Sequence, residues 1–181
     1  MHIQRLETSR LLLREWVDTD REPFAEMNGD PEVMQFFPKP LSHEESDRFI
    51  IKSNQILSEK KFGLWAVEVK DSKEFIGFIG LAAPAFEAHF TPCIEIGWRL
   101  KKQAWGKGFA TEGAVTVLQY GFQDLKLSEI VSFTSALNRP SIKVMERIGM
   151  TRKEHEDFDH PRIEHGHRLQ RHVLYRIKNC L

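Results

Sequence analysis

Hydrophobic residues recur at helical spacing in four segments of the chain. The strongest pattern covers residues 42–61, where Ile50 and Leu57 share the apolar side and Ser42 is followed three places later by Glu45. A serine with a glutamate three residues on is the signature of a capped helix start. The same spacing predicts further helices over residues 19–28, 108–125 and 138–148.

Runs of β-branched and aromatic residues lie between these helices. Residues 63–69 and 75–81 are separated by a polar segment, Lys70–Glu74, which predicts an antiparallel hairpin. Further strands are expected over residues 11–13, 93–100 and 130–133 and after residue 150. Helices that alternate with mostly antiparallel strands indicate an α+β (α/β) fold in layers around one sheet.

The composition limits the partners and the location. The 181 residues are 41% hydrophobic, so residues 1–181 are expected to form a single domain. The 26 basic and 26 acidic residues cancel, which leaves no excess charge to bind nucleic acid or an anionic membrane. No run approaches the roughly 20 apolar residues of a membrane helix. We expect a cytoplasmic protein with no nucleic acid or membrane partner, and the oligomeric state, a homodimer included, stays open.

Two close glycines, Gly106 and Gly108, stand between a predicted strand and a predicted helix. Glycine lets backbone amides point at an anion, and a helix start adds about half a positive charge. A plain tight turn is the alternative. A Walker-type loop is excluded because Gly108 follows Lys107 directly, and a dinucleotide fingerprint fits poorly because Thr111 stands where its third glycine belongs.

This turn resembles the acetyl-CoA signature of the GNAT superfamily of N-acetyltransferases. The matching residues are Gln103-x-x-Gly106-x-Gly108, and the helix Asn138–Met150 resembles the Asn-x-x-Ser helix of the same family. The segments Leu6–Arg14, Glu95–Trp98 and Trp105–Glu112 resemble the Rim-type branch, which includes ribosomal-protein N-terminal acetyltransferases. The likeness therefore covers nearly the whole chain.

The resemblance implies a fold, a cosubstrate and an activity. The fold is a mixed, mostly antiparallel sheet of about seven strands, flanked by about four helices and splayed at the acetyl-CoA site. The activity is direct transfer of an acetyl group from acetyl-CoA to an amine, which is a protein or peptide N-terminus or a small molecule. A non-catalytic acyl-CoA-binding module or sensor is the alternative. The cofactor-binding residues that the resemblance implies are Ile96, Gly97, Trp98, Leu100, Gln103, Gly106, Lys107, Gly108, Ala110, Thr111, Asn138 and Ser141.

Transfer to an amine requires a neutral nitrogen, yet a lysine amine has a reference pKa near 10.4 and an α-amine one of about 8. Glu95 is the candidate base because the resemblance puts its strand beside the thioester, and partial burial would raise its pKa. A solvated or ion-paired carboxylate is the alternative reading of Glu95. Glu68, Glu112 and a water relay are weaker candidates.

The departing CoA thiolate is helped by a hydroxyl donor, and Ser141 is the candidate that the resemblance implies. Its alternative role is to satisfy an amide at a helix start. Tyr175 in the last strand is a second candidate acid, with a buried structural role as its alternative. The resemblance also implies that a backbone amide near Gly97 or Trp98 meets the tetrahedral oxyanion.

Five of the eight histidines follow residue 150. The spacing His165-x-His167 is compatible with a metal ligand pair. The phrase around His160 resembles a segment that borders the acceptor cleft in the Rim-type branch. We expect no metal, and His160 is a candidate for acceptor contact, with a plain loop role as the alternative. Phe36, Phe37, Phe86 and Phe90 are candidates for the cleft mouth or for the core.

Overall fold

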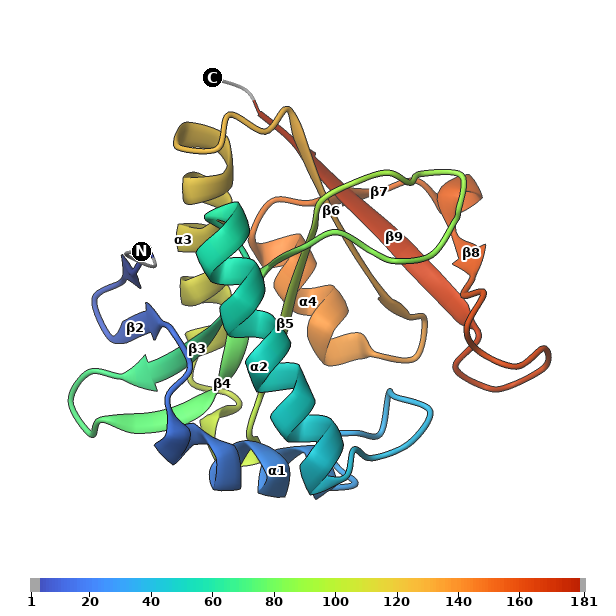
Figure 1. Ribbon diagram of the computed structural model, residues 1–181. Coiled ribbons are helices and arrows are strands. Elements are labelled where there is room, and N and C mark those ends of the chain that lie inside the picture. The colour runs from blue at the N-terminus through green and yellow to red at the C-terminus, as the bar shows by residue number, and fades with distance from the viewer. Residues whose placement is uncertain (1–3, 180–181) are drawn as a thin grey trace.

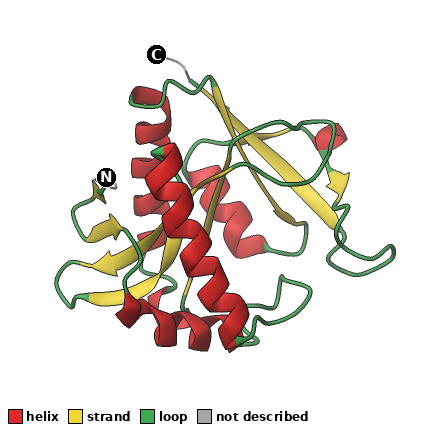
Figure 2. Cartoon of the chain, viewed as in Figure 1, coloured by secondary structure: helices red, strands yellow, loops and turns green. Residues whose placement is uncertain are grey.

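One mixed sheet organises the chain (Figures 1 and 2). The computed structural model describes residues 4–179. The strands follow the order β1-β2-β3-β4-β5-β6-β9-β7, and β8 pairs with β9. Their bounds are β1 Leu6–Glu7, β2 Leu11–Arg14, β3 Leu64–Val69, β4 Glu74–Ala82, β5 Glu95–Leu100, β6 Glu129–Ser135, β7 Thr151–Arg152, β8 Phe158–Asp159 and β9 Arg171–Lys178. The helices are α1 Arg21–Gly29, α2 His43–Lys60, α3 Phe109–Gln123 and α4 Arg139–Arg147.

The sheet has nine strands among the described residues, where about seven were expected. Three of them, β1, β7 and β8, are only two residues long, too short to show an alternating pattern in the sequence. The mostly antiparallel pairing and the four α-helices are as expected. No helix within residues 4–179 is long and apolar enough to cross a membrane.

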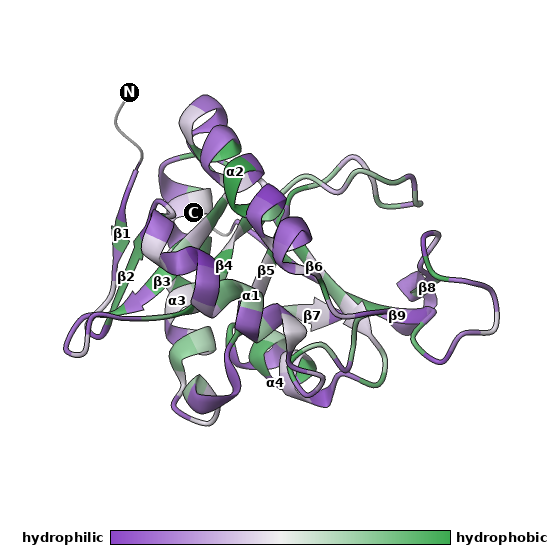
Figure 3. Ribbon diagram, turned by 60° about the horizontal axis from the view of Figure 1, so that its bottom comes forward, coloured by the Kyte–Doolittle hydropathy of each residue, from purple (hydrophilic) through white to green (hydrophobic). Residues whose placement is uncertain are grey.

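Helices cover both faces of the sheet. Phe78 of β4 packs among Phe24 of α1 and Phe49 of α2. The next residue, Ile79, points to the opposite face and comes so close to Gly113 of α3 that a Cβ there would lie 2.4 Å from Ile79 Cδ1. Successive side chains of a strand alternate between faces, so α1 and α2 lie on one face and α3 on the other. In Figure 3 the hydrophobic colour follows the central strands between these layers.

The helix starts follow the sequence closely. Ser42 accepts a hydrogen bond from the Glu45 amide at 3.1 Å, and the Glu45 carboxylate accepts one from the Ser42 amide at 2.8 Å, which completes a capping box for α2. Asn138 caps α4 by accepting a hydrogen bond from the Ser141 amide at 3.2 Å. Each cap satisfies a backbone donor that the helix itself leaves without a partner.

The sheet splays between β5 and β6. These two strands are parallel and pair at one position, Glu95 with Val131, after which they diverge. The Ser132 hydroxyl of β6 also donates to the Ile96 carbonyl at 2.9 Å, and the Val131 amide donates to the carbonyl of Ile94, just before β5, at 2.9 Å. The fork leaves the following part of β5 without a backbone partner on that side, and it is the splay that the family resemblance implied.

A buried charge network anchors the edge of the sheet that leads into α1. The Arg14 guanidinium of β2 donates to both oxygens of Asp20, at 2.7 and 2.9 Å, and to Glu68 of β3 at 2.9 Å. Asp20 is 1% exposed, and it also accepts the Val17 amide. Buried charges persist in this way only when they are paired and hydrogen-bonded.

Replacing Asp20 with alanine is expected to destabilise the protein by about 3 to 5 kcal/mol, because the Arg14 guanidinium stays buried without its principal partner. Asp18→Ala is the matched control: Asp18 lies two residues away and its side chain is 93% exposed. This control should change stability by less than about 0.5 kcal/mol. Urea unfolding measures both changes, and equal losses would contradict the anchoring role.

Candidate active site

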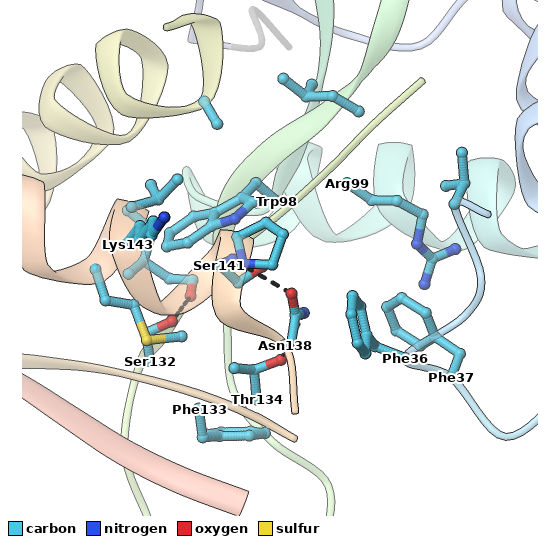
Figure 4. A pocket seen from close by; sticks show the side chains of 18 of the residues that line it. Phe36, Phe37, Trp98, Arg99, Ser132, Phe133, Thr134, Asn138, Ser141 and Lys143 are labelled. Carbon is cyan, nitrogen blue, oxygen red and sulfur yellow. Dashed lines mark hydrogen bonds between the residues drawn. The ribbon is translucent and has the colours of Figure 1, made fainter. Parts of the chain in front are cut away.

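The fork opens into a cavity of about 920 Å³, a size typical of ligand pockets (Figure 4). Its walls come from β5, β6, the starts of α3 and α4, and the segment between α1 and α2. Most of the residues expected to bind the cofactor line it: Ile96, Gly97, Trp98, Leu100, Gly106, Gly108, Ala110, Thr111, Asn138 and Ser141. Gln103 and Lys107 belong to the same turn but are exposed and do not line the cavity.

The glycine turn places free backbone amides at the start of α3. Gly106 and Gly108 have φ values of 74° and 80°, the left-handed region that glycine adopts without strain. Gly108 is the residue before α3. The backbone amides of the first turn of α3 have no partner within the helix, and they are directed toward the cavity. Arg10, the residue before β2, holds the glycine turn in place: its guanidinium donates to the Lys107 carbonyl at 3.0 Å and pairs with the Glu112 carboxylate.

The direction of backbone groups along β5 follows from one hydrogen bond. The Lys101 amide donates to the Ile76 carbonyl of β4 at 2.9 Å, and the pairing continues without a bulge to Glu95. Peptide groups alternate between neighbours along an antiparallel strand, so those of Gly97 turn toward β4. Those of Trp98 turn into the fork. Of the two amides considered for the oxyanion, only that of Trp98 is directed at the cavity.

Glu95 differs from the other candidate bases in having no partner. Within residues 4–179 no hydrogen bond or ion pair to its carboxylate is found, and burial raises its pKa from 4.5 to about 8. Glu68 is bound to Arg14. Glu112 accepts from Thr8, Ser9 and Arg10, and although burial raises its pKa, these hydrogen bonds leave it lowered overall. Glu95 alone of the three lines the cavity.

The two candidate acids lie in different places. Ser141 lines the cavity, and Asn138 already caps the helix start, so the Ser141 hydroxyl is not used as the cap. Tyr175 does not line the cavity: it is 5% exposed, and its hydroxyl donates to Glu146 of α4 at 3.1 Å. Burial and this carboxylate raise the Tyr175 pKa, which weakens it as an acid. The structure therefore brings Ser141, and not Tyr175, to the cavity.

Comparisons with known proteins identify the family of this chain. Residues 10–151 match the acetyltransferase (GNAT) domain. The chain belongs to the GNAT acetyltransferase family. It is 33% identical over 154 residues to an uncharacterized N-acetyltransferase of Bacillus subtilis, YnaD, covering 84% of each protein. A GNAT-family acetyltransferase from Bacillus anthracis superposes with a TM-score of 0.79 at 29% identity, over 97% of this chain and 99% of that one.

A Rim-type structure is also similar. The ribosomal L7/L12 α-N-protein acetyltransferase RimL, solved in complex with coenzyme A, has a TM-score of 0.78 over 97% of this chain and 98% of that one. At 14% identity it shows that the fold is shared. The family makes this GNAT chain an acyltransferase and implies acetyl-CoA as its cosubstrate.

Aromatic rings form part of the cavity wall in this GNAT protein. His160 and His172 line it, with ring centroids 4.9 Å apart, and burial lowers the pKa of His160 to about 4. Phe86 and Phe90 pack with Phe158 into a second hydrophobic cluster. Residues 4–179 contain no group of three or more His, Cys, Asp or Glu placed to hold a metal ion.

Sequence reasoning missed several cavity residues. Arg99, Ser132 and Thr134 line the cavity, as do Phe36 and Phe37, which were candidates for either mouth or core. Arg99 could have been found from its place in the strand, because it is four residues after Glu95 and therefore points to the same face. Ser132 and Thr134 belong to a strand that joins the site only through the fork.

The raised pKa of Glu95 predicts a pH-dependent stability difference. Between about pH 4.5 and 8 the folded protein binds a proton that the unfolded chain lacks, so the stabilisation associated with Glu95 is full below pH 4.5 and is lost as pH rises through 8. The free energy of unfolding of the wild type minus that of Glu95→Gln should fall over this window. Denaturant unfolding at several pH values measures it, and a constant difference would mean that Glu95 has an ordinary pKa.

Proposed function

We propose that this GNAT chain transfers the acetyl group of acetyl-CoA directly to a primary amine, with Glu95 as the general base. The observation that carries the proposal is the isolated Glu95 carboxylate at the point where β5 and β6 part. A base with a pKa of about 8 is half ionised at about pH 8, and its ionised form can accept the proton of an attacking amine.

The proposed reaction begins with attack of the amine on the thioester. The amine nitrogen forms a bond to the thioester carbonyl carbon, and its proton passes to the Glu95 carboxylate. The Trp98 amide stabilises the negative charge that develops on the carbonyl oxygen. The carbon–sulfur bond then breaks, and the Ser141 hydroxyl protonates the departing thiolate and regains a proton from solvent. No covalent enzyme intermediate forms.

Two kinds of acceptor fit this step, a protein or peptide N-terminus and a small-molecule amine. The name of RimL favours an N-terminus, but its 14% identity supports only a shared fold. The relative at 33% identity is named as an N-acetyltransferase, which supports nitrogen as the acceptor atom. A non-catalytic acyl-CoA sensor is the competing function, and turnover decides between them.

The cosubstrate is tested by thermal unfolding with acetyl-CoA, CoA, ATP and NAD. A ligand at 100 times its dissociation constant adds about 2.7 kcal/mol of stability. We expect this with the CoA compounds alone, and a smaller shift in Gly108→Val, because a branched side chain is strained at φ 80°. A larger shift with NAD would show that the glycine turn binds a different ligand.

The catalytic roles are tested by thiol release with a panel of primary amines and N-terminal peptides. Glu95→Gln should lower kcat/KM by about 10²- to 10⁴-fold, and Ser141→Ala should lower it less. Tyr175→Phe is the control and should stay close to the wild type. CoA binding without thiol release from any amine would favour the sensor, and full activity in both Glu95→Gln and Ser141→Ala would remove the assigned roles.

A further inference from the structure

Arg99 is a charged side chain in the cavity without an acidic partner. No carboxylate within residues 4–179 lies within 4.0 Å of its guanidinium, although the side chain is half-buried and desolvation lowers its pKa to about 10. At that pKa the group is still charged at pH 7. A charge in this setting is costly unless an anion accompanies it.

The neighbours of Arg99 fix its orientation without neutralising it. Nη1 donates to the Asn28 side-chain oxygen of α1 at 2.7 Å. The guanidinium carbon lies 4.1 Å from the Phe37 ring centroid and 5.4 Å from that of Phe78. Asn28 is itself held by the Ser46 hydroxyl of α2 at 3.0 Å. The guanidinium is thus held as a planar donor group between two rings.

One edge of this guanidinium has no partner. Nε is buried and makes no hydrogen bond within the described chain, and none is found for Nη2, which is not buried. Nε and Nη2 form the edge of the guanidinium opposite Nη1. Two parallel donors on one edge match the two oxygens of a carboxylate, which is the bidentate pairing that arginine makes best. An unsatisfied buried donor is uncommon in folded proteins and calls for an explanation.

Arg99 and Glu95 lie on one face of β5, with Gly97 between them. A Cβ built on Gly97 would meet only the Glu95 carboxylate, at 3.6 Å, so the space above this position is open. Four residues of strand put the Cα atoms of Glu95 and Arg99 about 13 Å apart. The open space above Gly97 therefore lies between the proposed base and the unpaired guanidinium. Figure 4 shows Arg99 beside Phe36 and Phe37, away from Ser141.

We propose that Arg99 binds a carboxylate of the acceptor through its Nε and Nη2 edge, so that the acceptor is an amine that also carries a carboxylate. The carboxylate meets the exposed Nη2 first, and a shift of the side chains that cover Nε opens this second donor to it. This inference rests on the proposed amine acetylation. The carboxylate belongs either to a small amino acid or to an acidic residue near a peptide N-terminus. In both cases Glu95 receives the amine proton and Arg99 fixes the other end of the acceptor.

The test compares acceptors that differ only in this charge. The small-molecule arm uses amino acids of the form H₂N–(CH₂)ₙ–CO₂⁻ with different chain lengths beside their carboxamides. The peptide arm uses Ala-Asp-Ala amide beside Ala-Asn-Ala amide. For at least one pair, thiol release by the wild type should give a kcat/KM about tenfold or more in favour of the carboxylate, as expected for a charge-assisted hydrogen bond. The arm that shows the preference identifies the source of the carboxylate.

Arg99→Gln should abolish the preference while kcat/KM for the neutral acceptor and the KM for acetyl-CoA stay within about twofold. Arg162→Gln is the matched control, because Arg162 also lines the cavity but is exposed and donates to the Ala85 carbonyl. It should keep the preference. Arg99→Lys, which retains the charge but lacks the planar edge, should keep only part of it.

Equal rates with acids and amides in the wild type would overturn the inference and leave the proposed function standing. An equal loss for both acceptors in Arg99→Gln would show a structural role and also overturn it. If no amine releases thiol, the proposed function fails. The anion site is then tested by calorimetric titration of CoA-saturated protein with the same acids and amides. If the wild type binds the acids and Arg99→Gln does not, the site is upheld. If the wild type does not bind the acids, the site is ruled out.

Discussion

The pairing of Glu95 with Val131 is the constraint on which the active site depends, because within residues 4–179 it is the one position where β5 and β6 pair as strands before they diverge. Each strand is paired on its outer side, β5 with β4 and β6 with β9, so the fork is held open by the sheet itself. The gap exposes the peptide groups of Trp98, which an unbroken sheet would satisfy. The same separation makes room for the cavity and leaves the Glu95 carboxylate without a neighbour to neutralise it.

The charge of the whole chain says little about this cavity. The sequence is neutral, yet the cavity is lined by more basic than acidic residues, among them Arg99, Arg139, Lys143, Arg147 and Arg162 beside Glu32 and Glu95. Acidic residues elsewhere are used in local pairs, such as Asp20 with Arg14 and Glu112 with Arg10. Local pairing therefore allows a neutral protein to present a positively charged site. The three basic residues of α4, Arg139, Lys143 and Arg147, suit the phosphates of the CoA cosubstrate that the family implies.

Features coded by adjacent residues could be predicted, and features created by long-range packing could not. The α2 capping box lies within four residues, Ser42 to Glu45, and the hairpin of β3 and β4 follows from alternation and a polar turn. Tyr175 was ambiguous because its position in a strand does not reveal that Glu146 of α4 faces it. The role of Arg99 could not be predicted, because its surroundings come from three segments that are distant in the sequence: β5, α1 and the segment that carries Phe37.

The peptide groups and the side chains of β5 face different parts of the site. The peptide groups of Ile96 and Trp98 face the fork, where the cosubstrate would lie, whereas the side chains of Glu95 and Arg99 face α1 and α2. Asn28 of α1, which accepts the hydrogen bond from Arg99, donates in turn to the Ser46 hydroxyl of α2. That hydroxyl donates to the carbonyl of Ser42, the cap of α2, so both helices hold Arg99 in place. In the proposed reaction, therefore, the acceptor half of the site is carried by side chains and the cosubstrate half mainly by backbone. Side chains on this face can be exchanged without altering the direction of a single peptide group, so acceptor choice can change in this fold while cosubstrate binding is retained.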